Sequence, residues 1–304
     1  MGRQQKEINE SSVLICGPVR NVAKVILQEL QIMANATSSF KETHFLLVES
    51  DSNDETVQLL EAESIKRSNF QLISNGKLSG KIKKRTERIA FCRNIIVDEV
   101  IRNSKLRNID YVMMADLDGM NHLITREKIN ECWNLDQIWD VLTANQGENY
   151  YDIWALRHPL WCPDDCWQLK EKLEPLVGEK YAVNLAVTAR QVILDPRSQL
   201  IEVDSAFGGF AIYKKEAFIS GRYHGLDSNG KEIADHVIFH QAIKLAGYKI
   251  FINPALINCA KYPENAITEI PKKSSLIIKT IKKMGLKIFG KKRFNKYVKQ
   301  LITY

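Results

Sequence analysis

The sequence predicts an α/β protein built on one mostly parallel sheet with helices on both faces. Two observations predict this: strands alternate with helices through the first half of the chain, and residues 111–115 form an unbroken apolar run. The 304 residues are 45% hydrophobic and 26% charged, an ordinary globular composition that allows a sizeable core. This composition excludes collagen-like, disordered and disulfide-scaffold proteins.

The expected strands are short apolar runs that end in polar or turn-forming residues. They are residues 13–16, 44–48, 70–73, 111–115, 151–156, 192–194, 200–203, 210–213 and 248–252. The first is expected to stop at Gly17-Pro18. The run 111–115 is apolar throughout, which is typical of a strand buried on both faces.

The expected helices have apolar residues at three- and four-residue spacing. They are residues 21–33, 56–65, 85–101, 124–142, 214–218 and 235–246. Between residues 158 and 203 we expect mostly irregular structure: a loop rich in aromatic and acidic residues, then a hairpin or two short strands. No internal repeat is present in the sequence.

The net charge of +7 is unevenly distributed. From Lys272 to Tyr304 there are eleven Lys and Arg and no acidic residue, which leaves a balance of −4 for the rest of the chain. Ile277, Ile281 and Ile288 share one side of a helical projection with Met284. This basic amphipathic segment favours an anionic membrane surface over nucleic acid, and packing on the protein's own acidic body is a third interpretation.

The cysteines and the first ten residues bear on location. The six cysteines are scattered without paired spacing: Cys16, Cys92, Cys132, Cys162, Cys166 and Cys259. Residues 1–10 carry no apolar run of the kind found in a signal peptide. We therefore expect free thiols in a reducing cytoplasm, with the protein peripheral on the inner face of the membrane.

Two carboxylates follow the predicted strand 111–115. Ligands of an open parallel sheet bind beyond the carboxyl ends of its strands, where Asp116 and Asp118 lie. If extended, residues two apart face the same side. Hard carboxylate oxygens suit Mg²⁺ or Mn²⁺ held together with substrate phosphates. An Asp-rich turn without a metal is the alternative interpretation.

A series of segments in fixed order resembles the GT-A fold of nucleotide-sugar glycosyltransferases. The resemblance is to the family-2-like group and the capsule-associated α-mannosyltransferase-like proteins, and it spans residues 12–258. The matching segments are 16–21 (CGPVRN), 49–56 (ESDSNDET), 88–94 (RIAFCRN), 116–118 (DLD), 205–210 (SAFGGF) and 235–240 (DHVIFH). Two positions depart from the pattern, since Glu49 replaces the commoner Asp and His236 follows Asp235 where an acid is usual.

The resemblance implies a role for each segment. It implies metal ligands at Asp116, Asp118 and His240, and a general base at Asp235, which would invert the anomeric centre. It implies donor contacts at Gly17, Pro18, Arg20, Glu49, Asp51, Arg93, Asp116, Gly208 and Gly209.

Each of these roles has a structural alternative. The alternatives are helix capping for Glu49 and Asp51, an ordinary salt bridge for Arg93, a helix-dipole interaction for Asp235 and a core position for His240. For Gly208-Gly209 the alternative is a plain turn.

The domain organisation and function follow from the resemblance. Residues 11–265 are expected to form the transferase domain, with a nucleotide-binding half (11–120) and an acceptor half (121–265), followed by a basic tail (266–304). The expected activity is transfer of a sugar from a UDP- or GDP-linked donor to a glycan or glycolipid, in surface polysaccharide synthesis. The alternatives are a nucleotidyltransferase, or a non-catalytic membrane- or nucleic-acid-binding protein. The sequence does not indicate an oligomeric state.

Overall fold

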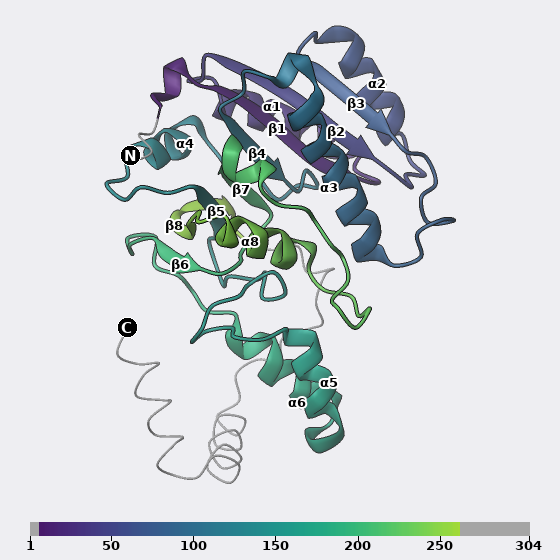
Figure 1. Ribbon diagram of the computed structural model, residues 1–304, viewed down its shortest axis with the longest axis vertical. Coiled ribbons are helices and arrows are strands. Elements are labelled where there is room, and N and C mark those ends of the chain that lie inside the picture. The colour runs from purple at the N-terminus through teal and green to yellow at the C-terminus, as the bar shows by residue number, and fades with distance from the viewer. Residues whose placement is uncertain (1–5, 262–304) are drawn as a thin grey trace. The chain divides into compact units, whose positions relative to one another are not determined.

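The computed structural model describes residues 6–261, which form one compact unit around an eight-stranded sheet (Figure 1). The strands are β1 (Ser12–Val19), β2 (Glu42–Glu49), β3 (Phe70–Ser74), β4 (Tyr111–Ala115), β5 (Val141–Gln146), β6 (Ile201–Val203), β7 (Phe210–Lys214) and β8 (Ile250–Cys259). The helices are α1 (Ile26–Ala36), α2 (Thr56–Lys66), α3 (Arg85–Arg102), α4 (Arg126–Trp133), α5 (Cys166–Val177), α6 (Glu179–Ala186), α7 (Lys215–Ile219) and α8 (Asp235–Leu245). Short 3₁₀ turns are η1 (Ile8–Glu10), η2 (Ser104–Leu106) and η3 (Thr188–Arg190).

The sheet has the order β3-β2-β1-β4-β7-β5-β8-β6. Strands β3, β2, β1 and β4 are parallel, β7 is antiparallel to both β4 and β5, β8 is parallel to β5, and β6 is antiparallel to β8. From β1 the chain builds outward through β2 and β3, then returns to place β4 on the other side of β1. This reversal of strand order is where open α/β sheets bind ligands.

Helices cover both faces of the sheet, which confirms the predicted fold class. In β1, Val13 and Ile15 point into a core shared with α1, α2 and α4. The alternate residues Leu14 and Cys16 point into a core shared with α3, α7 and α8. The side chains of β4 alternate in the same way, because successive residues of a strand face opposite sides. Figure 1 shows α3 crossing β1 and β2 on the near face.

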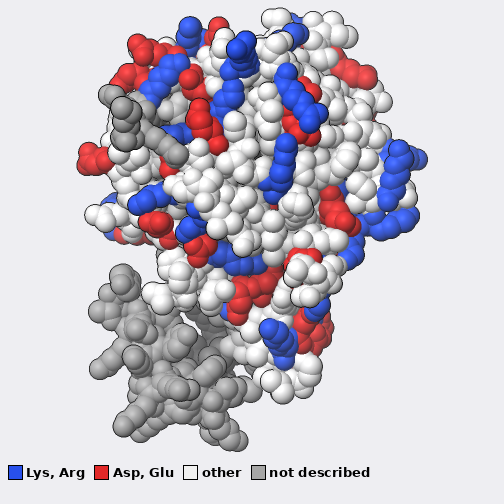
Figure 2. All heavy atoms as spheres, in the orientation of Figure 1, with Lys and Arg blue, Asp and Glu red and all other residues white. Residues whose placement is uncertain are grey.

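The surface carries both signs of charge. Figure 2 shows acidic and basic side chains interspersed on one face, with Lys and Arg gathered at the right edge over the loop between β3 and α3. Within residues 6–261 no helix combines the length and the apolar character that crossing a bilayer requires. The predicted basic tail (266–304) lies outside the described residues.

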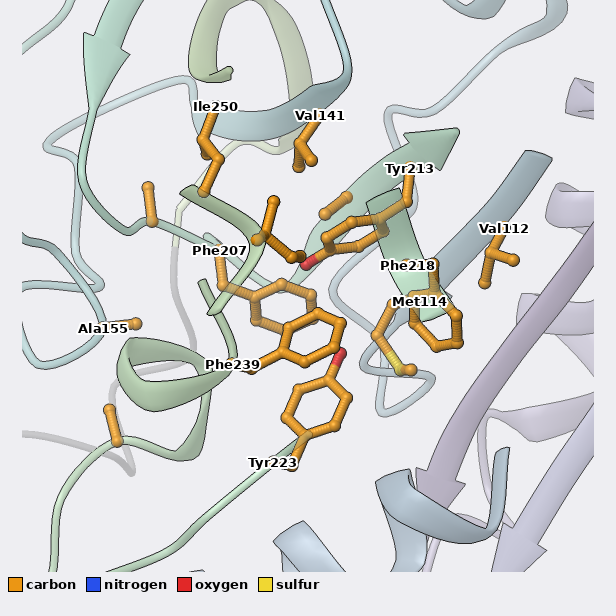
Figure 3. Packing of buried hydrophobic residues seen from close by; sticks show 14 of the residues in the cluster. Val112, Met114, Val141, Ala155, Phe207, Tyr213, Phe218, Tyr223, Phe239 and Ile250 are labelled. Carbon is orange, nitrogen blue, oxygen red and sulfur yellow. The ribbon is translucent and has the colours of Figure 1, made fainter. Parts of the chain in front are cut away.

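An aromatic cluster packs under the reversed strand β7 (Figure 3). The rings of Tyr223 and Phe239 stack with centroids 3.8 Å apart and 11° between their planes. Tyr213 meets Phe218 and Phe239 edge to face at 5.5 and 5.8 Å. Such ring pairs add specific geometry to a large apolar burial. The cluster therefore holds α7 and α8 firmly against the strand that borders β4.

Several elements differ from the prediction. Strand β1 continues through Gly17-Pro18, because a glycine lets it approach β4: a Cβ on Gly17 would lie 2.1 Å from the Ala115 carbonyl oxygen. The predicted helix 124–142 ends at Trp133, and β5 begins at Val141. The predicted strand 151–156 is made of turns, and residues 192–194 contribute only an isolated bridge at Ile193.

Helices α5 and α6 occupy part of the segment predicted to be irregular. They pair with each other and stand apart from the sheet (Figure 1). Asp165 caps α5, since its Oδ1 accepts hydrogen bonds from the backbone amides of Trp167 and Gln168 at 3.0 and 3.1 Å. Their signal is weak in the sequence because few of their residues are fully buried, Cys166 being the one in α5 and Ala182 and Ala186 those in α6.

Candidate active site

Asp116 and Asp118 lie in a tight turn at the carboxyl end of β4. The strand is fully buried up to Ala115, and the turn starts at Leu117. Leu117 points into the core with 1% of its surface exposed, whereas Asp118 is exposed. The two carboxylates are thus presented by an anchored turn and not by extended backbone, which corrects the geometry assumed from their spacing.

Arg93 of α3 joins Asp116 to Asp235 of α8. Its Nη2 donates to Asp116 Oδ1 at 3.1 Å, and its Nη1 donates to both oxygens of Asp235 at 2.7 and 2.8 Å. The guanidinium also lies 5.1 Å from the centre of the Phe207 ring. Only 6% of the Arg93 side chain is exposed, against 34% for Asp116. Arg93 therefore orients Asp116 from below and does not reach toward solvent, which favours the salt-bridge interpretation over the expected direct contact with the donor.

Asn121 and Glu29 form a second set of hydrogen bonds that holds the backbone at Asp116. The Nδ2 of Asn121 donates to the Asp116 carbonyl oxygen at 2.8 Å and to Glu29 Oε2 at 2.7 Å. Glu29 comes from α1 on the opposite face of the sheet, and it is 2% exposed. Burial raises the pKa of Glu29, and its hydrogen bonds with Asn121 oppose that rise. Asp116 is consequently fixed from both faces of the sheet.

The Gly208-Gly209 turn borders the carboxylates. Both glycines have positive φ, 68° and 84°, and a Cβ on Gly208 would lie 2.6 Å from the Ala144 carbonyl oxygen. The Gly209 carbonyl oxygen accepts from the Asp116 amide at 2.8 Å. The Gly208 amide donates to Asp152 Oδ2 at 3.0 Å. Glycine is needed here both for its conformation and for close packing, and the turn brings Asp152 to the site.

The clustered acids shift one another's proton affinity. Partial burial raises the pKa of Asp116 to about 7; the Arg93 guanidinium opposes this rise, and the charges of Asp118 and Asp152 add to it. Loss of water from around its carboxyl group raises the pKa of Asp118, and burial raises the pKa of Asp152. Perturbed carboxylates gathered at a ligand-binding edge of a sheet are typical of a functional site.

The donor set fits a hard divalent cation that also binds substrate oxygens. Asp118 is exposed and Asp116 is one-third open, so both present carboxylate oxygens, which Mg²⁺ and Mn²⁺ prefer. Among residues 6–261, no three His, Cys, Asp or Glu side chains are grouped as a metal site of their own. A cation held by one or two carboxylates completes its shell with water and phosphate.

His240 is placed differently from the prediction. It is fully buried, with Nδ1 at 3.0 Å from Ser205 Oγ and Nε2 at 2.9 Å from Tyr213 Oη. Burial lowers its pKa to about 3, so the ring is neutral. Both ring nitrogens are occupied, which leaves none for a metal. The residue belongs to the core beneath the 205–210 turn, which favours the core interpretation over the expected metal ligand.

Asp235 is also less accessible than its predicted role requires. Both of its oxygens accept from Arg93, and the residue is 6% exposed. A buried carboxylate whose two oxygens both accept from one guanidinium is poorly placed to reach an acceptor hydroxyl. The structure thus makes Asp235 the partner of Arg93, which favours another residue as the base.

Glu49 and Asp51, at the end of β2, bond to the protein itself. Glu49 is 1% exposed and accepts from the Ser52 amide at 2.9 Å and from Ser74 Oγ at 2.6 Å. The Asp51 side chain is 5% exposed and accepts from the Ser79 amide at 2.9 Å. These contacts stabilise the loop and favour a structural role over the expected donor contact.

The three donor contacts predicted after the first strand, Gly17, Pro18 and Arg20, differ in their exposure to solvent. Gly17 is buried between β1 and β4, and Pro18 is half-buried inside β1. Arg20 is exposed, and its Nε donates to the Asp51 carbonyl oxygen at 3.2 Å. Of these three residues, Arg20 is the one whose side chain is open to a ligand.

Three residues that support the site carry no recognisable signal in the sequence. Asp152 lies in a segment predicted as a strand, and Glu29 and Asn121 are far apart in sequence. Each becomes visible only through its tertiary contacts. Of the three, Glu29 has the one local signal: it is an acid beside Leu30 and Met33 on the apolar face of a helix, where an acid needs a buried partner.

Comparisons with known proteins give structural likeness only. No protein-family model matches the chain, and no curated protein matches its sequence. Staphylococcus aureus TarS (residues 1–349) is 14% identical with a TM-score of 0.45, over 83% of this chain and 60% of that one. The Pyrobaculum calidifontis mannosyltransferase PcManGT, solved with GDP-Man and Mn²⁺, is 13% identical with a TM-score of 0.47, over 87% and 62%.

Mycobacterium tuberculosis glucosyl-3-phosphoglycerate synthase is 12% identical with a TM-score of 0.37, covering 85% of this chain and 74% of that one. The chain therefore spans less than two thirds of the first two of these structures and about three quarters of the third.

Proposed function

We propose that the chain is a metal-dependent glycosyltransferase of the GT-A type. It moves a sugar from a UDP- or GDP-linked donor to a glycan or glycolipid acceptor. The observation that carries the proposal is the pair Asp116 and Asp118, held open at the carboxyl end of β4 where the strand order reverses. The choice of a nucleotide-sugar as substrate rests on the ordered segments that resemble such transferases.

The residues of the chain divide the work of binding and orientation. Asp116 and Asp118 would hold Mn²⁺ or Mg²⁺, which neutralises charge on a diphosphate leaving group. Arg93 keeps Asp116 in place from below, and Asn121 fixes its backbone. The buried Gly208-Gly209 turn has no side chains, so it packs closely against β5 and brings Asp152 to the site.

Asp152 replaces Asp235 as the proposed base. No described residue forms an ion pair with Asp152, and it lies near enough to Asp116 to raise that residue's pKa. In the proposed step an acceptor oxygen bonds to the anomeric carbon, the bond from that carbon to the diphosphate oxygen breaks, and the acceptor proton passes to Asp152. A single displacement of this kind inverts the anomeric centre.

The first test is Mn²⁺-dependent release of nucleotide from a panel of UDP- and GDP-sugars, with and without candidate glycan acceptors. We expect one donor to be turned over by the wild type and release to fall about 100-fold or more in Asp118→Ala. Asp136→Ala is the matched control, because Asp136 is an exposed acid that precedes β5 at the opposite edge of the sheet. Silence across the panel, with no metal-dependent nucleotide binding, would instead favour a non-catalytic binding protein.

The second test separates the base from donor binding. Asp152→Asn should reduce transfer by about 100- to 10,000-fold, the usual contribution of general base catalysis. The affinity for the donor nucleotide should stay within about twofold of wild type. Transfer that survives in Asp152→Asn and disappears in Asp235→Asn would return the role to Asp235.

The proposed acceptor also bears on location. We place the enzyme at the inner face of the membrane, with residues 272–304 as the proposed contact for anionic lipid. Co-sedimentation of the full chain with anionic vesicles, lost at high salt and absent with neutral vesicles, is the expected result. Equal binding to both kinds of vesicle would contradict an electrostatic contact.

A further inference from the structure

The loop between β3 and α3 concentrates positive charge. From residue 77 to residue 88 the chain has one acid, Glu87, and six basic residues: Lys77, Lys81, Lys83, Lys84, Arg85 and Arg88. Figure 2 shows Lys and Arg gathered where Figure 1 places this loop. Such a concentration of one sign of charge raises the local concentration of anions.

This loop lies at the same edge of the sheet as the carboxylates. It leaves the carboxyl end of β3, and β3 runs in the same direction as β4. Arg85 is the first residue of α3, the helix that also carries Arg93. The basic loop and the proposed metal ligands therefore face one region.

Two of the six cations hold the loop in shape. The Nη1 of Arg88 donates to the carbonyl oxygens of Ile82 and Lys83 at 2.9 and 2.7 Å. The Nζ of Lys84 donates to the Gly230 carbonyl oxygen. Leu78, with 6% of its surface exposed, anchors the start of the loop in the core. The loop is thus a braced structure that presents its remaining charges in a defined place.

The other four cations have no partner within the described part of the chain. The side chains of Lys77, Lys81, Lys83 and Arg85 are exposed and form no hydrogen bond or ion pair with residues 6–261. The Thr86 amide, in the first turn of α3, already donates to Glu232 Oε1 at 3.2 Å. The anion-binding capacity therefore comes from the side chains, and the backbone amide of Thr86 is not free to add to it.

We propose that Lys81, Lys83 and Arg85 bind the diphosphate group of the nucleotide donor. This inference rests on the proposed function and deepens it, because it names the residues that would contact the phosphates of the donor. Arg85 and Asp118 would lie on either side of the diphosphate, the guanidinium contacting phosphate oxygens directly. Charged hydrogen bonds of this kind are the strong ones, and the planar fork of arginine suits phosphate.

The test is isothermal titration of UDP and GDP into the full chain, in EDTA and in Mn²⁺. Uridine, guanosine and inorganic diphosphate are titrated beside them. The variants are Arg85→Gln, Lys83→Gln, Lys81→Gln and their triple combination. Lys105→Gln is the matched control, because Lys105 is an exposed lysine that precedes β4 at the opposite edge of the sheet. All substituted side chains are exposed, so melting temperatures should stay close to wild type.

In EDTA, Arg85→Gln should weaken binding of the preferred nucleoside diphosphate about tenfold, and the triple variant about 100-fold, as expected for lost charge-assisted hydrogen bonds. Affinity for the nucleoside should not change, and Lys105→Gln should match wild type.

Equal affinity in the triple variant and wild type would overturn the inference while the proposed function stands. An equal loss in Lys105→Gln would also overturn it, as a general effect of net charge. Binding of inorganic diphosphate without any nucleoside diphosphate would assign the loop to a phosphate-bearing acceptor and overturn the donor assignment. Failure of wild type to bind any nucleotide, with or without Mn²⁺, would overturn both proposals.

Discussion

Two pairs of acids stand at the same edge of the sheet and share the same spacing. Glu49 and Asp51 lie where β2 ends, and Asp116 and Asp118 lie where β4 ends. The first pair is almost completely buried, at 1% for the Glu49 residue and 5% for the Asp51 side chain. In the second pair Asp118 is exposed and Asp116 is 34% open. Two pairs of carboxylates at equivalent strand ends therefore differ in exposure: Glu49 and Asp51 are buried within the protein, whereas Asp116 and Asp118 are accessible to a ligand.

The difference comes from what surrounds each turn. At β2, neighbouring loops supply the donors: Ser52 and Ser74 bind Glu49, and Ser79 binds Asp51. At β4 the buried residue is Leu117, so the core takes up the apolar side chain between the two acids and leaves the carboxylates outside. The availability of a carboxylate is therefore decided by the partners that other segments bring to it.

Breaking the ion pair beneath the open acids should have the largest effect on stability. Arg93→Met leaves Asp235 buried without its cation, which should cost about 3–5 kcal/mol of unfolding free energy. Urea unfolding of the purified variants measures this loss. The double variant Arg93→Met with Asp235→Leu should recover much of it, because no uncompensated charge remains. A loss below about 1 kcal/mol in the single variant would mean that Asp235 is not held as the structure shows.

Substituting the two pairs separately sharpens the contrast between them. Glu49→Ala leaves the Ser52 amide and the Ser74 hydroxyl without their partner, at a cost of about 1–3 kcal/mol. Glu49→Gln should cost less, because an amide can accept from Ser52 and donate to Ser74. Asp118→Ala should change stability by no more than about 0.5 kcal/mol while donor turnover is lost. Lost turnover in Glu49→Gln at unchanged stability would instead make Glu49 a donor contact.

The third comparison concerns the pH dependence of stability. The pKa of Asp116 is about 7 in the folded protein, so between pH 4 and 7 the folded state binds a proton more tightly than the unfolded state. Wild type should therefore lose stability through this group as the pH rises from about 4 to 7. Asp116→Asn lacks the group, so its stability relative to wild type should rise over that window. Parallel curves in EDTA would contradict the raised pKa.

The strand-ending carboxylates and the alternating order of elements could be predicted because their cause is local. Residues 111–115 are apolar without interruption, and an apolar run followed by Asp and Gly indicates a buried strand that ends in a turn. The helical periodicity of α3 and α8 is equally local, and both were placed within one or two residues.

Strand β5 could not be found in this way. Its sequence, VLTANQ, ends in polar residues, yet all six positions are buried. Asn145 donates to the Pro254 carbonyl oxygen at 2.9 Å and Gln146 to the Gly208 carbonyl oxygen at 2.9 Å. A polar residue can be buried when a partner satisfies it, and those partners are about 60 and 110 residues away in the sequence.

The sequence by itself determined the α/β class, the position of the β4 turn and the chemistry of its two acids, because hydrophobic periodicity and turn residues act over a few neighbours. Only the tertiary structure decided which polar side chains are bonded within the protein and which are accessible to a ligand. Arg93 and Asp235 neutralise each other, His240 is enclosed by Ser205 and Tyr213, and Asp152 is brought to the turn by Gly208. Hydrogen bonds and ion pairs between distant segments set these roles, and no short stretch of sequence contains both partners.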